Sequence, residues 1–298
     1  MSLRPCARLL LNWLARMCHA GAMTGRLILA ATPIGNTDDA SVRLREALAH
    51  ADVVAAEDTR RLRDLVRRMG VEISGAVVAV HDHNERARAA ELVARAAAGE
   101  SVVLVSDAGM PTVSDPGYVL VRAAIEAGVE VTTLPGPSAV LAALAVSGLP
   151  TDRFAFEGFA PRKAGERAAA LAALQAEPRT LVFFESPRRL GDFLVDAAAG
   201  LGAEREAAVC RELTKTHEEV VRGTLGSLVE WARSREVLGE IVVVVAGRAA
   251  HAPSREAMVA EVLSRVAAGE RLKDASRAVA EAGGVSAREL YAAALASR

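Results

Sequence analysis

The feature that most constrains the fold of this chain is a repeated pairing of short apolar runs with polar turns. Runs at residues 27–31, 53–56, 77–80, 102–105 and 129–134 are each followed by a turn and then by a stretch with a helical pattern. Strands that alternate with helices in this way form a mostly parallel sheet. The first half of the chain is therefore predicted to be an α/β domain.

The turns after these five runs fall at one edge of such a sheet. They occupy residues 32–36, 57–60, 81–85, 106–109 and 135–138. Ligands of open α/β sheets bind beyond the carboxyl ends of the strands. We therefore expect the five turns to form a single site.

A break near residues 147–150 precedes a second set of candidate strands, at residues 153–157, 180–185, 206–211 and 240–246. Their order cannot be read from the sequence. After Pro253 the pattern is helical to Arg298, with glycine breaks. We expect an N-terminal α/β domain at 25–148, a C-terminal α/β domain at 149–250 and a helical tail at 251–298. Residues 1–24 resemble a weak signal peptide, but their apolar core is short and interrupted by Arg16, which favours an unstructured extension.

Composition excludes several classes of protein. Hydrophobic residues make up 51% of the 298 residues and charged residues 24%, as in a globular protein. The net charge of -1 gives no global attraction to nucleic acid, so any RNA contact must come from local basic patches. Cys6, Cys18 and Cys210 form no CxxC pair, which argues against a zinc site or a disulfide framework and favours the cytoplasm. No apolar run is long enough to span a membrane.

Common cofactor fingerprints are absent from the sequence. A dinucleotide site needs GxGxxG directly after a strand, and the only GxG, at residues 200–202, closes a helical stretch. No GxxxxGK[ST] phosphate loop occurs. A Rossmann cofactor site is therefore not expected, and any cofactor must be held by other means.

Three of the turns have the chemistry of a ligand-binding loop. Glycine and proline force sharp turns that expose backbone N–H and C=O groups beside polar side chains. The alternative is a set of ordinary rigid turns in which Asp115 or Ser138 caps the next helix. The residues concerned are Pro33, Gly35, Ser106, Asp107, Ala108, Gly109, Met110, Pro111, Pro135, Gly136, Pro137 and Ser138.

The turn at residues 81–85 places His81, Asp82, His83, Asn84 and Glu85 together. Two histidines with two carboxylates suit a divalent metal, but no further His or Cys has the spacing to complete a ligand shell. A general base is better motivated, since imidazole titrates near neutral pH. A polar loop whose Asp82 or Asn84 caps the next helix explains the pattern equally well.

Basic residues gather after two of the strand ends. Arg60, Arg63 and Arg67 share one helical face, which suits either phosphate contacts or a solvated surface. Residues 211–215, Arg-Glu-Leu-Thr-Lys, are too polar to be core at the end of a strand. These residues are further candidates for the site.

Nine short motifs follow one another along the chain, and together they closely resemble the small-subunit rRNA (cytidine-2′-O-)-methyltransferase I family, a branch of the tetrapyrrole methylases. The resemblance runs from about Leu27 to Gly247, and the helical tail is also similar. Met110 departs from it, because the family is expected to have threonine there. The motifs lie at residues 31–36, 56–60, 81–85, 106–109, 115–118, 134–137, 157–159, 184–187 and 211–215.

The resemblance implies a two-domain α/β class III methyltransferase fold, usually dimeric, that binds S-adenosylmethionine between the domains. The three turns named above would contact it from the first domain, and Phe184, Glu185, Leu213 and Thr214 would contact it from the second. The implied reaction is 2′-O-methylation of a cytidine ribose in 16S ribosomal RNA, free or in the assembled small subunit.

Methyl transfer to a ribose hydroxyl needs alignment and benefits from a base and a cation. We expect His83, Glu85 or Asp58 to be the base, and Lys215 or Arg60 to stabilise the oxyanion, with no metal. Two other functions stay open. One is methylation of a tetrapyrrole macrocycle, which the arginine stripe and the turn at 81–85 disfavour. The other is a non-catalytic RNA- or ribosome-binding module, which the clustered acids and cofactor-like turns disfavour.

Overall fold

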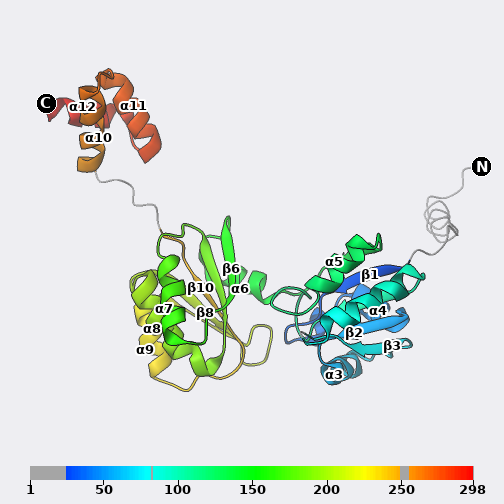
Figure 1. Cartoon of the computed structure of the whole chain (residues 1–298). Coiled ribbons are helices and arrows are strands. Elements are labelled where there is room, and N and C mark those ends of the chain that lie inside the picture. The colour runs from blue at the N-terminus through cyan, green and yellow to red at the C-terminus, as the bar shows by residue number, and fades with distance from the viewer. Residues whose placement is uncertain (1–24, 82, 249–254, 298) are drawn as a thin grey trace, which may run out of the picture. The chain divides into compact units, whose positions relative to one another are not determined.

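The computed structural model describes residues 25–81, 83–248 and 255–297. The predicted extension at 1–24 lies outside these residues. Two compact units are present: the described residues up to Gln175 with Arg179–Ala246 form the first, and Ala176–Pro178 with the residues from Gly247 onward form the second. The first unit contains two five-stranded sheets, and the second is helical (Figure 1).

The first sheet contains β1 (Arg26–Ala30), β2 (Val53–Ala56), β3 (Ala76–Ala79), β4 (Ser101–Val105) and β5 (Glu130–Leu134). All pairings are parallel, in the order β3-β2-β4-β1-β5. The prediction of a parallel α/β sheet is confirmed, with strand boundaries that differ by at most one residue. The carboxyl ends of all five strands therefore lie at one edge.

Both faces of this sheet are covered by helices, which explains why its strands read as continuous apolar runs. Helices α2 (Val42–His50) and α3 (Thr59–Met69) pack on one face, and α4 (Glu85–Ala97) and α5 (Tyr118–Glu126) on the other. Successive strand residues alternate between the two cores: Val53 faces α4 and α5, and Val54 faces α2 and α3.

The second sheet is mixed, in the order β6-β7-β10-β8-β9. Strand β6 (Phe154–Phe159) pairs parallel with β7 (Thr180–Glu185), whereas β8 (Glu206–Arg211), β9 (Glu219–Thr224) and β10 (Ile241–Val245) are joined by antiparallel pairings. Strand β9 was not predicted from the sequence. It is an edge strand that carries Arg222 and Gly223, so it lacks the apolar alternation of a strand packed on one face.

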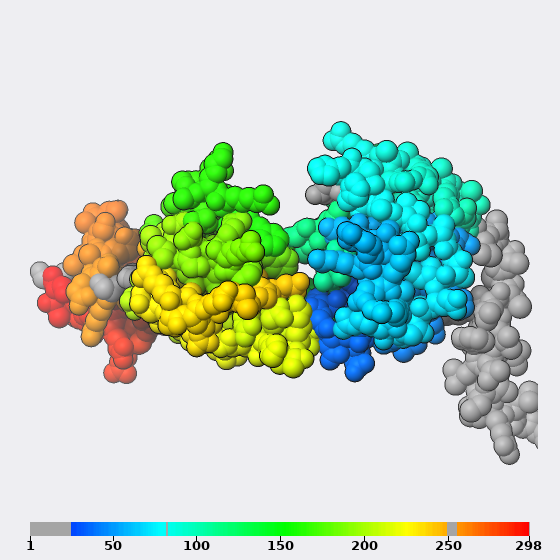
Figure 2. Space-filling model, turned by 90° about the horizontal axis from the view of Figure 1, so that it is seen from below, coloured from blue at the N-terminus to red at the C-terminus, as the bar shows by residue number. Residues whose placement is uncertain are grey.

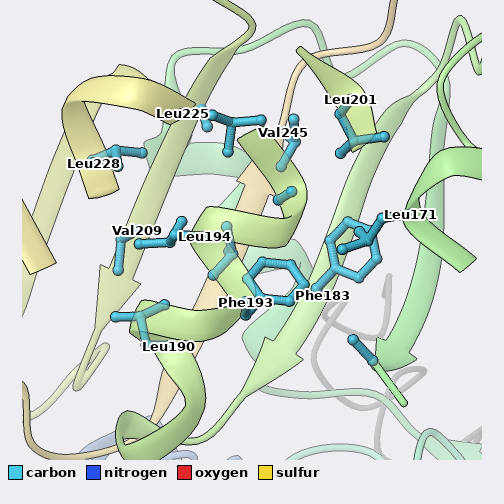
Figure 3. Close-up of a cluster of buried hydrophobic side chains, with 14 of the residues drawn as sticks. Leu171, Phe183, Leu190, Phe193, Leu194, Leu201, Val209, Leu225, Leu228 and Val245 are labelled. Atoms are coloured by element: carbon cyan, nitrogen blue, oxygen red, sulfur yellow. The ribbon is translucent and has the colours of Figure 1, made fainter. Parts of the chain in front are cut away.

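Each face of the second sheet is covered differently. Figure 3 shows the core under α7 (Ala164–Ala173), α8 (Pro187–Leu201) and α9 (Leu225–Arg233), where Phe193 packs against Phe183 with ring centroids 5.2 Å apart. Helix α6 (Ala139–Ser147) covers the opposite face with Val140, Ala143 and Leu144. This helix directly follows β5 of the first sheet yet completes the core of the second. The predicted boundary at residue 148 stays a prediction, and it lies beyond a helix that belongs to the second core.

The second unit is a small helical bundle of α10 (Arg255–Ala267), α11 (Leu272–Gly283) and α12 (Ala287–Ala296) (Figure 1). Its core is formed by Met258, Val262, Val279 and Leu290, with alanines between them. Gly284, in the left-handed conformation, ends α11, and Ser286 caps α12 two residues later. Among the described residues, no helix combines the length and the apolar character needed to cross a bilayer.

Candidate active site

The turns after β1 and β4 are joined directly. The backbone N–H of Thr32 donates to the carbonyl of Gly109 at 2.9 Å, and the N–H of Gly109 donates back to Thr32 at 3.1 Å. The buried Thr32 hydroxyl also lies 3.2 Å from the carbonyl oxygen of Ser106. Ser106 and Gly109 therefore hold the two turns in register.

The turn after β5 lies against the same pair. The N–H of Ala31 donates to the carbonyl of Leu134 at 3.1 Å. A Cβ on Gly136 would lie 3.0 Å from the Cβ of Ala31, so glycine permits this close approach. Of the five turns predicted to share one edge, those at residues 32–36, 106–109 and 135–138 therefore lie together.

Asp107 connects β4 to the turn after β2. Its Oδ1 accepts from the backbone N–H of Asp58 at 3.1 Å, and its Oδ2 forms an ion pair with Arg61 at 3.3 Å. Asp58 caps α3 through the N–H of Arg60 at 2.8 Å. Hydrogen bonds from the side chain and backbone of Arg60 lower the pKa of Asp58. Asp58 is therefore an anion at neutral pH with little tendency to take a proton.

The turn after β8 meets the first half of the chain. The backbone N–H of Asn36 donates to Oγ1 of Thr214 at 3.1 Å. A Cβ on Gly35 would lie only 2.4 Å from Cγ of Lys215 and 2.7 Å from Oγ1 of Thr214. Figure 2 shows early residues, in blue, lying against residues of the second half, in yellow-green. Gly35 is thus required by close packing against residues 214–215.

This turn is strained and held by charge. Glu212 (φ 53°) and Thr214 (φ 67°) are both in the left-handed region, which is costly for residues with a side chain. The Lys215 ammonium contacts Glu212 at 2.8 Å and Glu240 at 3.1 Å. The N–H of Glu240 also donates to Glu212 at 2.8 Å. These contacts fix a conformation that the backbone alone would not favour.

Burial disfavours the charged forms of both Glu212 and Lys215, but the hydrogen bonds together have the larger effect on each pKa. The pKa of Lys215 is raised by its bonds to Glu212 and Glu240. The pKa of Glu212 is lowered by the bond from Lys215 and by the backbone N–H of Glu240. Both groups are therefore charged at neutral pH.

Two adjoining cavities lie at this junction. The larger, of about 820 Å³, is lined by residues of both halves of the unit. The smaller, of about 330 Å³, is mainly apolar. Ile34, Ala108 and Glu240 line both, so the cavities share a wall. The larger is lined by Pro33, Ile34, Gly35, Asn36, Thr37, Arg61, Asp64, Leu65, Arg68, Asp107, Ala108, Thr214, Lys215, Thr216 and Glu240.

The smaller cavity is walled by aromatic and aliphatic side chains around one buried carboxylate. Phe159 and Phe184 pack edge to face, with centroids 5.6 Å apart. Burial raises the pKa of Glu185, although the N–H of Ser186 donates to it at 2.7 Å and Arg189 lies 3.1 Å away. Leu213 and Cys210 also line this cavity.

The predicted cofactor-contacting residues separate into two groups. Pro33, Gly35, Asp107, Ala108, Phe184, Glu185, Leu213 and Thr214 line a cavity. Ser106, Gly109, Met110, Pro111, Pro135, Gly136, Pro137 and Ser138 do not appear among the lining residues; Ser106, Gly109 and Gly136 hold the turns in place instead. The cofactor contacts themselves stay predictions.

Several lining residues were not predicted. Residue spacing placed Arg60, Arg63 and Arg67 on one face of α3, but the face that lines the larger cavity carries Arg61, Leu65 and Arg68. Arg60 is 87% exposed and pairs with Asp58. Glu240, Phe159 and Thr216 were also missed; the motifs around Phe159 and Lys215 were the available signal.

Of the predicted bases, the structure gives Glu85 a structural contact. Glu85 is buried, and its Oε1 accepts from the backbone N–H groups of Gly117 and Val119 at 2.8 and 2.9 Å, so it caps α5. His83 is exposed after β3, at the end of the sheet farthest from β5, and its ring lies 6.0 Å from that of His81. Among the described residues, no group of His, Cys, Asp and Glu side chains is arranged to hold a metal; Asp82 lies outside them.

Comparison with known proteins places this architecture. Residues 26–229 match the family model of tetrapyrrole (corrin/porphyrin) methylases. A Mycobacterium tuberculosis (strain CDC 1551 / Oshkosh) protein named ribosomal RNA small subunit methyltransferase I is 57% identical over 92% of this chain and 96% of that protein. A protein of the same name from Escherichia coli O157:H7 is 44% identical over 91% of this chain and 95% of its own.

A solved structure shares the fold. The uroporphyrin-III C-methyl transferase of Thermus thermophilus, complexed with S-adenosyl homocysteine, is 23% identical and has a TM-score of 0.53. The match covers 74% of this chain and 97% of that one. The prediction of a tetrapyrrole-methylase-like fold, made from sequence motifs, is confirmed by this likeness in the arrangement of the two sheets.

Proposed function

This chain belongs to the tetrapyrrole methylase family, among relatives named ribosomal RNA small subunit methyltransferase I, and on that premise we propose that it methylates a cytidine ribose 2′-hydroxyl of 16S ribosomal RNA with S-adenosylmethionine. The observation that carries the proposal is the pair of adjoining cavities, one apolar and one polar, at the carboxyl edge of the first sheet. A donor and an acceptor of different chemistry each need such a space.

The smaller cavity fits the cofactor. Phe159, Phe184 and Leu213 offer apolar contact area, and the buried carboxylate of Glu185, held by Ser186 and Arg189, lies at its wall. S-adenosylmethionine supplies a methyl group already activated on a sulfonium. The chain then has to hold donor and acceptor in line, and the common wall at Ile34, Ala108 and Glu240 is the place for that alignment.

The larger cavity fits the RNA. Arg61 and Arg68 line it from α3 and present guanidinium groups suited to phosphate oxygens. Lys215 lines it from the second half. An ammonium has three N–H donors, of which Glu212 and Glu240 accept two, so the third is available to a ribose oxygen. We assign Lys215 to stabilising the charge that develops on that oxygen.

We propose His83 as the base on the chemistry of its imidazole, although it lines neither of the two cavities. The low pKa of Asp58 makes it a weak proton acceptor, and Glu85 is committed to capping α5. A general base contributes roughly 10²–10⁴-fold. His83→Ala should lower turnover by that order while the affinity for S-adenosylmethionine persists, and His83→Gln should not restore it. Full turnover in both variants would remove His83 from the mechanism.

Two experiments test the function as a whole. Calorimetric titration with S-adenosylmethionine separates an enzyme from a non-catalytic ribosome-binding module. Mass mapping of 16S ribosomal RNA from a deletion strain, with and without the restored gene, then separates an RNA methylase from a macrocycle methylase. Absence of a ribose-methylated cytidine that returns with the gene would refute the proposal.

The oligomeric state, the cellular compartment and the form of the RNA substrate also belong to this proposal. We propose a cytoplasmic homodimer that acts on ribosomal RNA either free or in the assembled small subunit. Sedimentation of the purified chain tests the dimer. Methylation assays with a 16S transcript and with unmethylated small subunits, side by side, decide between the two substrates.

A further inference from the structure

The helical unit at residues 255–297 takes no part in either cavity. It carries six cationic and six acidic residues, so its overall charge is balanced. Three of those six cations nevertheless line a single groove of about 260 Å³, with no acid among its lining residues. We call this the C-terminal groove; it is lined by Lys273, Arg277, Ala287, Arg288 and Tyr291.

The cations of this groove are available to a ligand. Lys273 and Arg288 are exposed and form no ion pair within the described part of the chain. Arg277 is 71% exposed and pairs with Asp274 only at 3.4 Å, an exposed contact of little strength. Tyr291, 37% exposed, adds an aromatic ring to the groove wall. Clustered cations beside an exposed ring are suited to the phosphates and bases of a single-stranded nucleic acid.

The extent of the similarities points to RNA as the occupant. The tetrapyrrole methylase match ends at residue 229, before this unit begins. The relative named ribosomal RNA small subunit methyltransferase I matches 92% of the chain. The 8% of the chain left unmatched is about 24 residues, which is fewer than the 43 residues from 255 to 297. Proteins named for ribosomal RNA therefore share at least part of a unit that lies outside the family match.

We propose that the C-terminal groove binds the phosphate backbone of the ribosomal RNA substrate outside the catalytic cavities. The groove would supply affinity, while Arg61, Arg68 and Lys215 hold the reacting nucleotide. This inference rests on the proposed function for the identity of the RNA. It predicts that loss of the groove cations raises KM for RNA and leaves kcat nearly unchanged.

The test uses the full chain with Lys273, Arg277 and Arg288 all changed to Gln, which keeps long polar side chains at exposed positions. The matched control changes Arg255, Arg265 and Arg271 to Gln, three cations of the same unit that do not line the groove. The probes are a 16S transcript and small subunits from a strain without the modification. Binding is measured between 50 and 200 mM salt.

Each phosphate contact contributes about 0.7–1 to the slope of log affinity against log salt. The groove variant should therefore lose about 2–3 from this slope on the transcript, with S-adenosylmethionine affinity and helical content unchanged. The control variant should keep the wild-type slope. Equal losses in both variants, or an unchanged slope in the groove variant, would overturn the inference. So would a loss of binding confined to subunits, because that would indicate a protein partner.

The outcome is separable from that of the proposed function. If wild type methylates the RNA but the groove variant keeps its slope and KM, only the groove inference fails. If wild type methylates no RNA cytidine, the proposed function fails, and the salt slope still reports whether the groove binds RNA. A variant with Arg277→Lys and Arg288→Lys, which keeps the charges, should retain the slope.

Discussion

Replacing Lys215 by Met should destabilise the folded chain more than an ordinary ion pair would suggest. The substitution keeps the aliphatic stem but removes the ammonium between Glu212 and Glu240. The Glu212 side chain is only 18% exposed, so its carboxylate loses a charged hydrogen bond in a place that water reaches poorly. A hydrogen bond to a charged group contributes about 1.5–3 kcal/mol, whereas the exposed Glu240 adds about 0–1 kcal/mol.

The loss should thus be about 1.5–4 kcal/mol, or about 3–16 °C in melting temperature for a unit of this size. Lys163→Met is the matched control, because Lys163 contacts Glu166 at the same 2.8 Å but both side chains are well exposed. Its expected cost is below about 0.5 kcal/mol. Lys215→Arg, which keeps a cation, should fall between wild type and Lys215→Met.

The difference between wild type and Lys215→Met should also depend on pH. Because the folded pKa of Glu212 is lowered, its stabilisation is present above the ordinary glutamate pKa of about 4.3 and is lost as the pH falls through the folded value. The pKa of Lys215 is raised, so its contribution is lost only as the pH rises past that raised value, above about 10.4. Melting curves from pH 3.5 to 8 should show a constant gap near neutrality that closes in acid. A gap no larger than that of Lys163→Met would refute the description of this network.

Three further predictions concern single sites. Gly35→Ala places a Cβ 2.4 Å from Cγ of Lys215 and 3.0 Å from the carbonyl oxygen of Leu213, a residue that lines the smaller cavity. It should therefore cost about 1–3 kcal/mol and weaken S-adenosylmethionine binding in calorimetry, and unchanged affinity would show that the two halves adjust freely. Glu85→Ala should cost about 1.5–3 kcal/mol because it leaves two backbone N–H groups without their acceptor. Glu85→Gln keeps an acceptor oxygen and should retain methylation. Loss of turnover in Glu85→Gln at an unchanged melting temperature would instead identify Glu85 as a base. Burial raises the pKa of Cys210 to about 11. Peptide mapping should therefore find that iodoacetamide at pH 8 alkylates this thiol only after the chain is unfolded. Rapid labelling of the folded chain would contradict the burial of Cys210.

The sequence predicted the first sheet well because its signals are local. Val53–Ala56 is an apolar run buried on both faces and bounded by polar turns, so its position follows from composition alone. The edge strand Glu219–Thr224 was missed because an edge position tolerates Arg222 and Gly223. The antiparallel order of the second sheet depends on pairings between distant segments, which no local pattern records.

The site was predicted in outline but not in detail, for the same physical reason. Helical periodicity shows which arginines of α3 share a face, but not that the face with Arg61 and Arg68 is the one that lines the cavity. Glu85 appeared reactive in a loop of polar residues, although its partners are N–H groups more than thirty positions away. The resemblance to a family, rather than the residue pattern alone, supplied the cofactor and the reaction.

The position of α6 has a consequence for how this protein can be divided. Its Val140 and Leu144 complete a core formed with Val182 and Val244. A fragment that begins at residue 149 would expose that apolar face to solvent, and should aggregate when expressed alone. A fragment that begins at residue 139 should remain dispersed. A chimaera of two related enzymes that is joined at residue 148 would consequently separate α6 from the core it completes. An exchange of halves must keep α6 together with the second sheet, although the helix follows the first sheet in sequence.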